Sequence, residues 1–177
     1  MGSRTRKRII GTAATLLAVA WAGTACGSDS DGGDAGGTLT ATELCAVLTD
    51  ADLAPLREEA VDSEPEPDES AVIRECRWPV APGWGFLTIK VFEPAAGTEL
   101  FTGGAERTIE VGAATGYVTS KSDWSSCSMS VIGPRTPDGF LLAVDYDMPY
   151  GMAETDPDHC KKVVPQREKV LEALGWA

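Results

Sequence analysis

His159 and Cys160 come closest to a catalytic pair, because a histidine can activate a cysteine thiol as a nucleophile. Neighbouring residues on a helix do not face each other, however, and Cys160 is expected to be oxidised. His159 is the only histidine, hence the only conventional base for a serine nucleophile, and no Gly-x-Ser-x-Gly sequence is present. We therefore expect His159 to be an exposed residue near a helix start, and we expect the protein not to be an enzyme.

Asp145 and Asp147 form a second candidate group, because residues two apart on a strand share one face. Paired carboxylates can transfer protons or hold a cation. The sequence offers no second carboxylate pair beside them, which favours surface charge over acid–base chemistry. The cysteines form no Cys-x-x-Cys pair, and one histidine cannot complete a zinc-finger pattern. We expect no metal and no cofactor.

The candidate ligand contacts are aromatic. Trp84 stands between two glycines, just before a predicted strand. A tryptophan with so little local cover either plugs the edge of a sheet or contacts a ligand, and the plug is the more ordinary role. Trp78 and Trp124 would add to the same surface. Tyr146 shares a strand face with apolar residues, so we expect its side chain in the core.

The first 25 residues have the pattern of a secretory signal peptide. Four cations lie between Arg4 and Arg8, and an uncharged run from Ile9 to Ala25 follows them and ends in small residues. The run is short and rich in alanine, so we do not expect a stable membrane span. We assign residues 1–25 to a signal peptide that is removed.

Cys26 follows directly, in a context that resembles the bacterial lipobox, with Gly23 where that pattern has Leu, Val or Ile. The resemblance implies that the Cys26 thiol receives a diacylglycerol and that Cys26 becomes the N-terminus. Residues 26–37 would then be the lipidated cysteine and a flexible Gly/Ser/Asp linker, and residues 38–177 one folded extracytoplasmic domain. The alternative is a plain secreted protein in which Cys26 is a spare thiol.

Five cysteines are an odd number for an exported protein. If Cys26 carries lipid, four remain, and disulfides persist in an oxidising compartment. Four cysteines allow three pairings. We favour Cys45–Cys76 and Cys127–Cys160, because Cys45 and Cys160 lie on predicted helices and Cys127 lies in a core-facing row of a predicted strand. Each disulfide would then join a helix to the sheet.

Helices are predicted near both ends of the domain. Thr40 with Glu43 forms a capping-box pattern, and Thr49 with Asp52 offers a second cap. The acidic segment from Glu59 to Ser70 is predicted to be a solvated loop.

The last helix is expected to begin at Asp156 and Pro157, since Pro is favoured at the first helical position. Pro165 should kink it, and Gly175 suits its C-terminal cap. Trp176 is expected to pack back against the helix end.

Strands are indicated by short runs of β-prone and alternating residues: "AVIRECRW", "GFLTIKVF", "RTIEV", "TGYVTS", "SCSMSVI" and "GFLLAVDY". In "SCSMSVI" the alternation places Cys127, Met129 and Val131 on one face and serines on the other. The predicted fold is α+β: an antiparallel sheet of about five or six strands, with N- and C-terminal helices on one face and two helix-to-sheet disulfides.

The order of these pieces resembles the actinobacterial lipoproteins of the domain-of-unknown-function 3558 family. The matching stretches run from Thr40 to Leu174: "LCAVLTDADLAPL", "ECRW", "VGAATGY", "CSMSV" and "DPDHCKKVVPQREKVLEAL", after a lipobox-like cysteine and a Gly/Ser linker. The resemblance implies secretion and a lipid anchor, and it brings no activity with it.

Charge narrows the function further. Without the four cations of the first 25 residues, 11 Lys and Arg face 27 Asp and Glu, a net charge of −16. Phosphate backbones repel such a chain, so we expect no nucleic-acid partner. The expected function is a binding or sensing module for a small molecule, glycan or protein, held by its lipid on the extracytoplasmic face of the cell membrane. The alternative is an accessory envelope protein that binds a protein partner and no small ligand.

Overall fold

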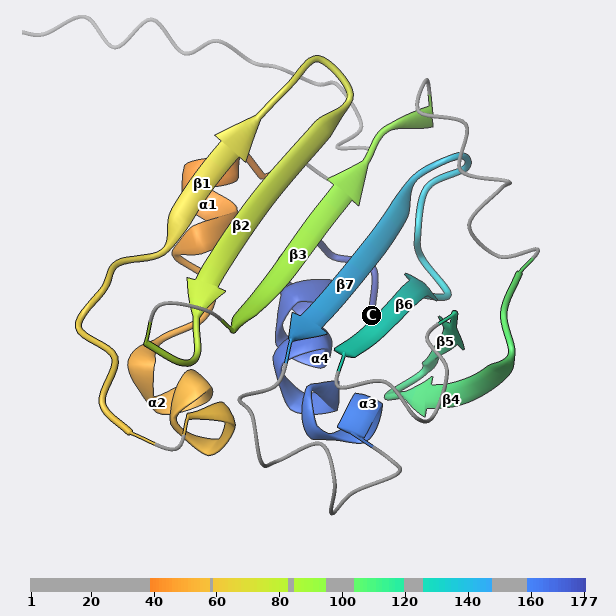
Figure 1. The fold of residues 1–177 in the computed structure, drawn as a ribbon. Coiled ribbons are helices and arrows are strands. Elements are labelled where there is room, and N and C mark those ends of the chain that lie inside the picture. The colour runs from red at the N-terminus through yellow and green to blue at the C-terminus, as the bar shows by residue number, and fades with distance from the viewer. Residues whose placement is uncertain (1–38, 58, 83–84, 95–103, 120–125, 148–158) are drawn as a thin grey trace, which may run out of the picture. The chain divides into compact units, whose positions relative to one another are not determined.

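Seven antiparallel strands form one sheet in the order β1-β2-β3-β7-β6-β5-β4 (Figure 1). The computed structural model describes residues 39–57, 59–82, 85–94, 104–119, 126–147 and 159–177. The predicted signal peptide, Cys26 and the linker lie outside these ranges, as do Asp156 and Pro157. The strands are β1 (Glu66–Glu69), β2 (Ile73–Pro79), β3 (Phe86–Phe92), β4 (Arg107–Val111), β5 (Ala114–Val118), β6 (Ser126–Ile132) and β7 (Leu141–Asp147).

The prediction of five or six strands is wrong, because the acidic segment predicted as a loop contributes β1. This strand has no apolar alternation, and all four of its residues are exposed. It is held by pairing with β2 and by ion pairs across the two strands, Glu66 with Arg77 (3.4 Å) and Glu69 with Arg74 (3.7 Å). Pro67 is tolerated because β1 is an edge strand.

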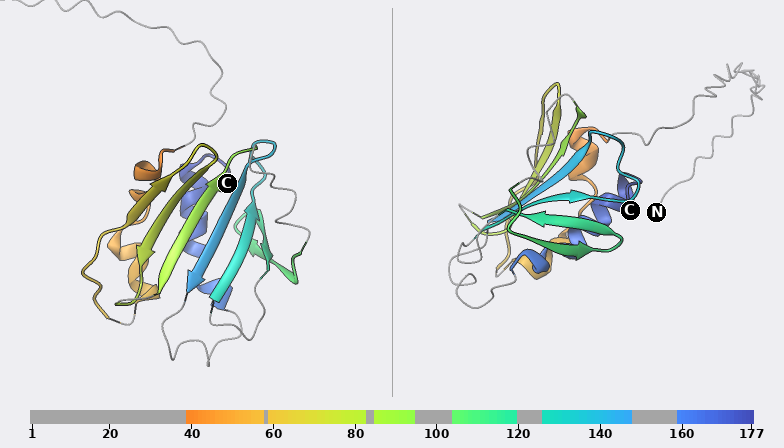
Figure 2. Two further views of the ribbon diagram at one scale, coloured as in Figure 1. Left: turned by 45° about the horizontal axis from the view of Figure 1, so that its top comes forward. Right: turned by 90° about the vertical axis from the view of Figure 1, so that its right-hand side faces the viewer.

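The helices lie on one face of the sheet, with α1 behind β1 and β2 and α4 behind β7 (Figures 1 and 2). All are short, and no helix in the described part of the chain has the length and apolar character needed to cross a bilayer. They are α1 (Ala41–Cys45), α2 (Asp50–Leu53), the 3-10 helix η1 (Ala54–Leu56), α3 (His159–Lys162) and α4 (Val164–Ala173).

Local signals set where these helices begin and end. Both predicted capping boxes are present, at Thr40 and at Thr49. The kink predicted at Pro165 is a full break between α3 and α4, with the proline in the first turn of α4, where an amide hydrogen has no helical partner. Gly175 ends α4 with a φ of +72°, and the Trp176 N–H donates to the Leu171 carbonyl (2.8 Å).

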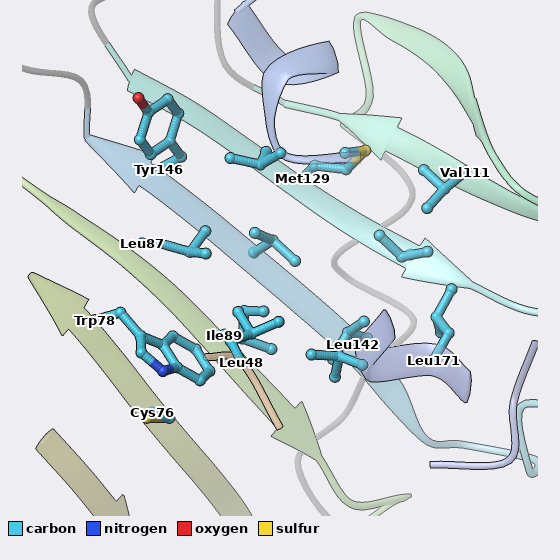
Figure 3. Close-up of a cluster of buried hydrophobic side chains, with 14 of the residues drawn as sticks. Leu48, Cys76, Trp78, Leu87, Ile89, Val111, Met129, Leu142, Tyr146 and Leu171 are labelled. Carbon is cyan, nitrogen blue, oxygen red and sulfur yellow. The ribbon is translucent and has the colours of Figure 1, made fainter. Parts of the chain in front are cut away.

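The core lies between the helices and the facing side of the sheet. Strand register places its largest side chains in rows across β2, β3, β7 and β6, and Figure 3 shows several of them together with Leu48 of the α1–α2 connection and Leu171 of α4. The predicted core position of Tyr146 is confirmed, and Trp176, which was predicted to pack back against the helix end, is fully buried as well. One charged side chain, Arg167 of α4, is buried with them. The opposite side, here called the outer face, carries the polar residues of the same strands.

Two disulfides fasten the helices to the sheet, with the predicted partners. Cys45 of α1 is bonded to Cys76 of β2, and Cys127 of β6 to Cys160 of α3. Their members are separated by 31 and 33 residues in the chain. Each removes conformational freedom from the unfolded chain and is worth roughly 3–4 kcal/mol on the chain-entropy account.

Asp52 connects the two helical regions. Its carboxylate accepts hydrogen bonds from the Thr49 N–H (2.7 Å) and hydroxyl (2.6 Å) and from Lys169 of α4 (2.6 Å). The bond from Lys169, then those from Thr49, lower the pKa of Asp52 to about 2.

Replacement of Asp52 by asparagine is therefore expected to make the protein less sensitive to acid. The folded pKa lies below the unfolded value of 3.8, so the carboxylate stabilises the fold above pH 4 and loses this effect as the pH falls towards 2. Because Lys169 is 42% exposed, the contribution of the Asp52 carboxylate to the free energy of unfolding is expected to stay below about 1 kcal/mol. Urea unfolding of the wild type and Asp52→Asn at pH 6, 4 and 2 measures it. The exposed Asp138→Asn is the control, and equal acid sensitivity in all three proteins would contradict the assignment.

Candidate ligand-binding site on the outer face of the sheet

The outer face carries a pocket of about 320 Å³ over β3, β7 and β6. These strands are neighbours, and their register aligns Lys90 with Ala143 and Ser130, and Asp145 with Ser128. Strand alternation sends these side chains away from the core. The lining residues are Lys90, Phe92, Thr119, Ser128, Met129, Ser130, Ala143 and Asp145.

A chain of polar contacts crosses the floor of this pocket. The Ser128 hydroxyl donates to Asp145 Oδ1 (2.6 Å), and Lys90 Nζ lies 3.7 Å from Asp145 Oδ2 and 3.6 Å from Glu75 Oε2. The side chains of Lys90 and Asp145 are 29% and 40% exposed, so both remain accessible. The pocket thus presents a cationic donor, a carboxylate acceptor and a hydroxyl within one small area.

Thr119 closes one side of the pocket. Its N–H and hydroxyl both donate to the Ser128 carbonyl, at 2.9 and 3.2 Å, and hold the end of β5 against β6. Phe92, which is 8% exposed, supplies an apolar wall. Hydroxyls that both donate and accept, beside a charged pair and an aromatic ring, suit a ligand rich in hydroxyl groups.

The predicted carboxylate pair does share one face, with Asp145 in the pocket and Asp147 outside its lining. Burial, and then the negative charge of Asp145, raises the pKa of Asp147, while Arg77 opposes the shift. Within the described ranges no three His, Cys, Asp or Glu residues are grouped as metal ligands.

Trp78, one of the three predicted tryptophan contacts, does not line this pocket. Trp78 is fully buried in the core, where its indole N–H donates to the Cys45 carbonyl (3.3 Å), so the structure gives this side chain a packing role. Trp84 and Trp124 lie outside the described residues, and their predicted contact role stays a prediction.

The expectation of an exposed His159 is wrong, because the start of α3 packs against β6. The imidazole is 1% exposed, and its Nε2–H donates to the Ser126 carbonyl (2.8 Å). Its neighbour Cys160 is in a disulfide, so it offers no thiol to activate.

Sequence reasoning missed Lys90, Ser128 and Ser130 as site residues. Their signal was available in part: the alternation of "SCSMSVI" and "GFLTIKVF" shows which residues face away from the core. What was lacking is the strand order, which places β7 between β3 and β6.

Comparison with protein-family models, with curated proteins and with solved structures found no match in any of the three.

Proposed function

We propose that the protein is an extracytoplasmic lipoprotein, anchored through Cys26, whose folded domain binds a small neutral ligand rich in hydroxyl groups, such as a sugar. The observation that carries the binding role is the outer-face pocket, in which Lys90, Ser128 and Asp145 converge. Membership of the domain-of-unknown-function 3558 family is part of the same proposal.

The cysteine pairing supports the proposed location. Four cysteines are bonded to each other in two disulfides, which leaves Cys26 as the one cysteine for another use. Structural disulfides persist in oxidising compartments outside the cytosol. Two acyl chains on a cysteine would hold the protein firmly, since each buried methylene contributes about 0.8 kcal/mol.

The pocket's size and charge support the proposed ligand class. About 320 Å³ is near the lower end of the range for small-molecule sites, which fits a monosaccharide better than an oligosaccharide. Lys90 lies within ion-pair distance of both Asp145 and Glu75, so the site offers no uncompensated positive charge to an anion. The acidic surface as a whole disfavours anions.

Native mass spectrometry tests the whole proposal on protein extracted from membranes of its own host without reducing agent. The expected species begins at Cys26, carries a diacylglycerol and contains both disulfides. Additional mass that is lost on denaturation would be the bound ligand. A soluble species without lipid would contradict the anchor.

The pocket itself is tested by replacing Ser128 with alanine. Loss of its hydroxyl removes one hydrogen-bonding group and is expected to weaken binding about 2- to 10-fold. The readout is amide chemical-shift perturbation during titration with neutral monosaccharides, starting with glucose, galactose and mannose. Ser126→Ala is the matched control, because Ser126 lies on the same strand face outside the pocket lining. Equal affinities of the two variants, or no binding by the wild type, would contradict this site.

A further inference from the structure

The buried guanidinium of Arg167 in α4 lies against the Cys127–Cys160 disulfide. Its Nη2 is 3.4 Å from Cys127 Sγ and its Nη1 is 3.4 Å from Met129 Sδ, while Nε has no hydrogen-bond partner. No carboxylate in the described ranges forms an ion pair with this side chain. Because neutral sulfur is a weak acceptor, the oxidised protein leaves the buried cation poorly compensated.

Reduction of this disulfide would supply the missing anion. A thiolate at Cys127 puts a negative charge on the sulfur that Arg167 already contacts, and a nearby cation favours the ionised form of a thiol. The other titratable side chains around Cys127 are Tyr146, opposite it on β7, and His159 of α3. Both donate to main-chain carbonyls, at 3.5 and 2.8 Å, so neither is an anion that competes for the guanidinium.

The two sulfurs differ in how firmly their segments are held. Cys127 lies on β6, inside the sheet between β5 and β7. Cys160 lies on α3, a single turn of four residues that ends at the break before α4. Opening of one helical turn costs far less free energy than removal of an inner strand from a sheet. Cys160 is therefore the sulfur that an incoming thiolate reaches.

We propose that Cys127–Cys160 is a thiol–disulfide exchange site for a dithiol, in which Arg167 stabilises the Cys127 thiolate as the leaving group. A thiolate of the dithiol attacks Cys160 Sγ, the disulfide bond of the protein breaks, and its electron pair stays on Cys127. The second sulfur of the dithiol loses its proton and displaces Cys160, which takes up a proton. The protein disulfide gains two electrons, the dithiol becomes a disulfide, and one proton is released because Cys127 stays ionised.

The second disulfide of the chain is an internal control. Cys45–Cys76 also joins a helix to a strand, with a similar separation in the chain. The arginines beside Cys76 on β2, Arg74 and Arg77, form ion pairs with glutamates, and neither donates to a sulfur in the described part of the chain. The exchange site lies in the core, and its proposal does not depend on the ligand proposed for the outer-face pocket.

The test equilibrates the purified full chain in detergent with reduced and oxidised dithiothreitol at pH 6.5, 7.25 and 8. After acid quenching, free thiols are labelled with a maleimide in denaturant, and peptide masses identify each cysteine. Burial lowers the pKa of Arg167 to about 9, so the guanidinium stays mostly charged over this range. Because one proton is released, the equilibrium constant for reduction of Cys127–Cys160 is expected to rise at least about tenfold from pH 6.5 to 8. The constant for Cys45–Cys76 is expected to change less than about twofold, because ordinary thiols stay protonated.

Two variants identify the cause of this pH dependence. Arg167→Met is expected to abolish it and to make Cys127–Cys160 at least about tenfold harder to reduce at pH 8 relative to Cys45–Cys76. Arg135→Met, which removes an exposed cation, is expected to change neither disulfide. Since Arg167→Met retains His159, a pH dependence that survives in this variant would overturn the role of Arg167. A wild type in which both disulfides respond equally to pH, including one that unfolds on reduction, would overturn the exchange site.

A monothiol tests the direction of attack, because it stops the reaction at the mixed disulfide. With 2-mercaptoethanol, the adduct is expected on Cys160, with Cys127 free. Adducts mainly on Cys127 would contradict its role as the leaving group.

Discussion

Replacement of Arg167 by methionine is expected to raise the free energy of unfolding at pH 7 by about 1–4 kcal/mol. The guanidinium is fully buried, and its two terminal nitrogens contact sulfur atoms, Nη1 at 3.4 Å from Met129 Sδ and Nη2 at 3.4 Å from Cys127 Sγ. Thioether and disulfide sulfurs are weak acceptors. Nε has no hydrogen-bond partner, and no carboxylate in the described ranges forms an ion pair with Arg167. Methionine keeps most of the volume and removes the buried charge.

The pH dependence of this difference identifies its cause. Burial lowers the pKa of Arg167 to about 9 from 12.5. The destabilising charge is therefore fully present below pH 9, and it is lost as the pH rises from 9 towards 12.5, because the unfolded state then binds more protons than the folded state. The advantage of Arg167→Met over the wild type is expected to shrink above pH 9, by up to about 1.4 kcal/mol per pH unit.

Urea unfolding of the wild type and Arg167→Met at pH 7, 9 and 10.5 measures this difference in the free energy of unfolding. Arg135→Met is the control, since Arg135 is exposed and its side-chain Nε–H donates to the main-chain oxygen of Ala177 (2.6 Å). The difference in the free energy of unfolding between Arg135→Met and the wild type should not change with pH. If Arg167→Met is less stable than the wild type at pH 7, or if its advantage is the same at all three pH values, the guanidinium is adequately compensated and the argument fails.

Arg167 also shows what the sequence could and could not reveal about the core. It lies four residues after Val163 and four before Leu171, so helical spacing places it on the same face as these two apolar residues. Charged side chains are rarely buried without an ionic partner, so the residue type alone does not indicate the core position that packing against β6 gives it. Likewise, β1 was not predictable from alternation, since it depends on cross-strand contacts with Arg74 and Arg77.

Features that depend on a pattern of only a few consecutive residues could be predicted from the sequence. The capping boxes at Thr40 and Thr49, the break at Pro165 and the alternation of β6 all belong to this kind. The disulfide partners could be predicted because each pair joined a cysteine of a predicted helix to a cysteine of a predicted strand. The outer-face pocket needed more, because Lys90 and Ser128 become neighbours only through β7, which enters the sheet between two strands that precede it in the chain.

The double variants Cys127→Ser/Cys160→Ala and Cys127→Ala/Cys160→Ser are expected to differ in stability, although both lack the same disulfide. Both variants should lose about 4 kcal/mol from the missing cross-link. In Cys127→Ser/Cys160→Ala a hydroxyl takes the place of the Cys127 sulfur beside Arg167 Nη2, and hydroxyl oxygen accepts from a cation far better than sulfur does. Hydrogen bonds to charged groups contribute about 1.5–3 kcal/mol. In Cys127→Ala/Cys160→Ser the hydroxyl lies on the other side of the former bond.

We therefore expect Cys127→Ser/Cys160→Ala to be more stable by about 1 kcal/mol or more, measured by urea unfolding at pH 7. The same comparison with Arg167→Met added to both variants separates this cause from packing. Without the guanidinium, the difference in stability should fall to a few tenths of a kcal/mol, because the two variants have identical composition and lack the same cross-link. A difference that survives in the Arg167→Met background would place its origin in α3 or β6 instead. The Arg167 charge would then have no measurable effect on which atom is preferred at position 127.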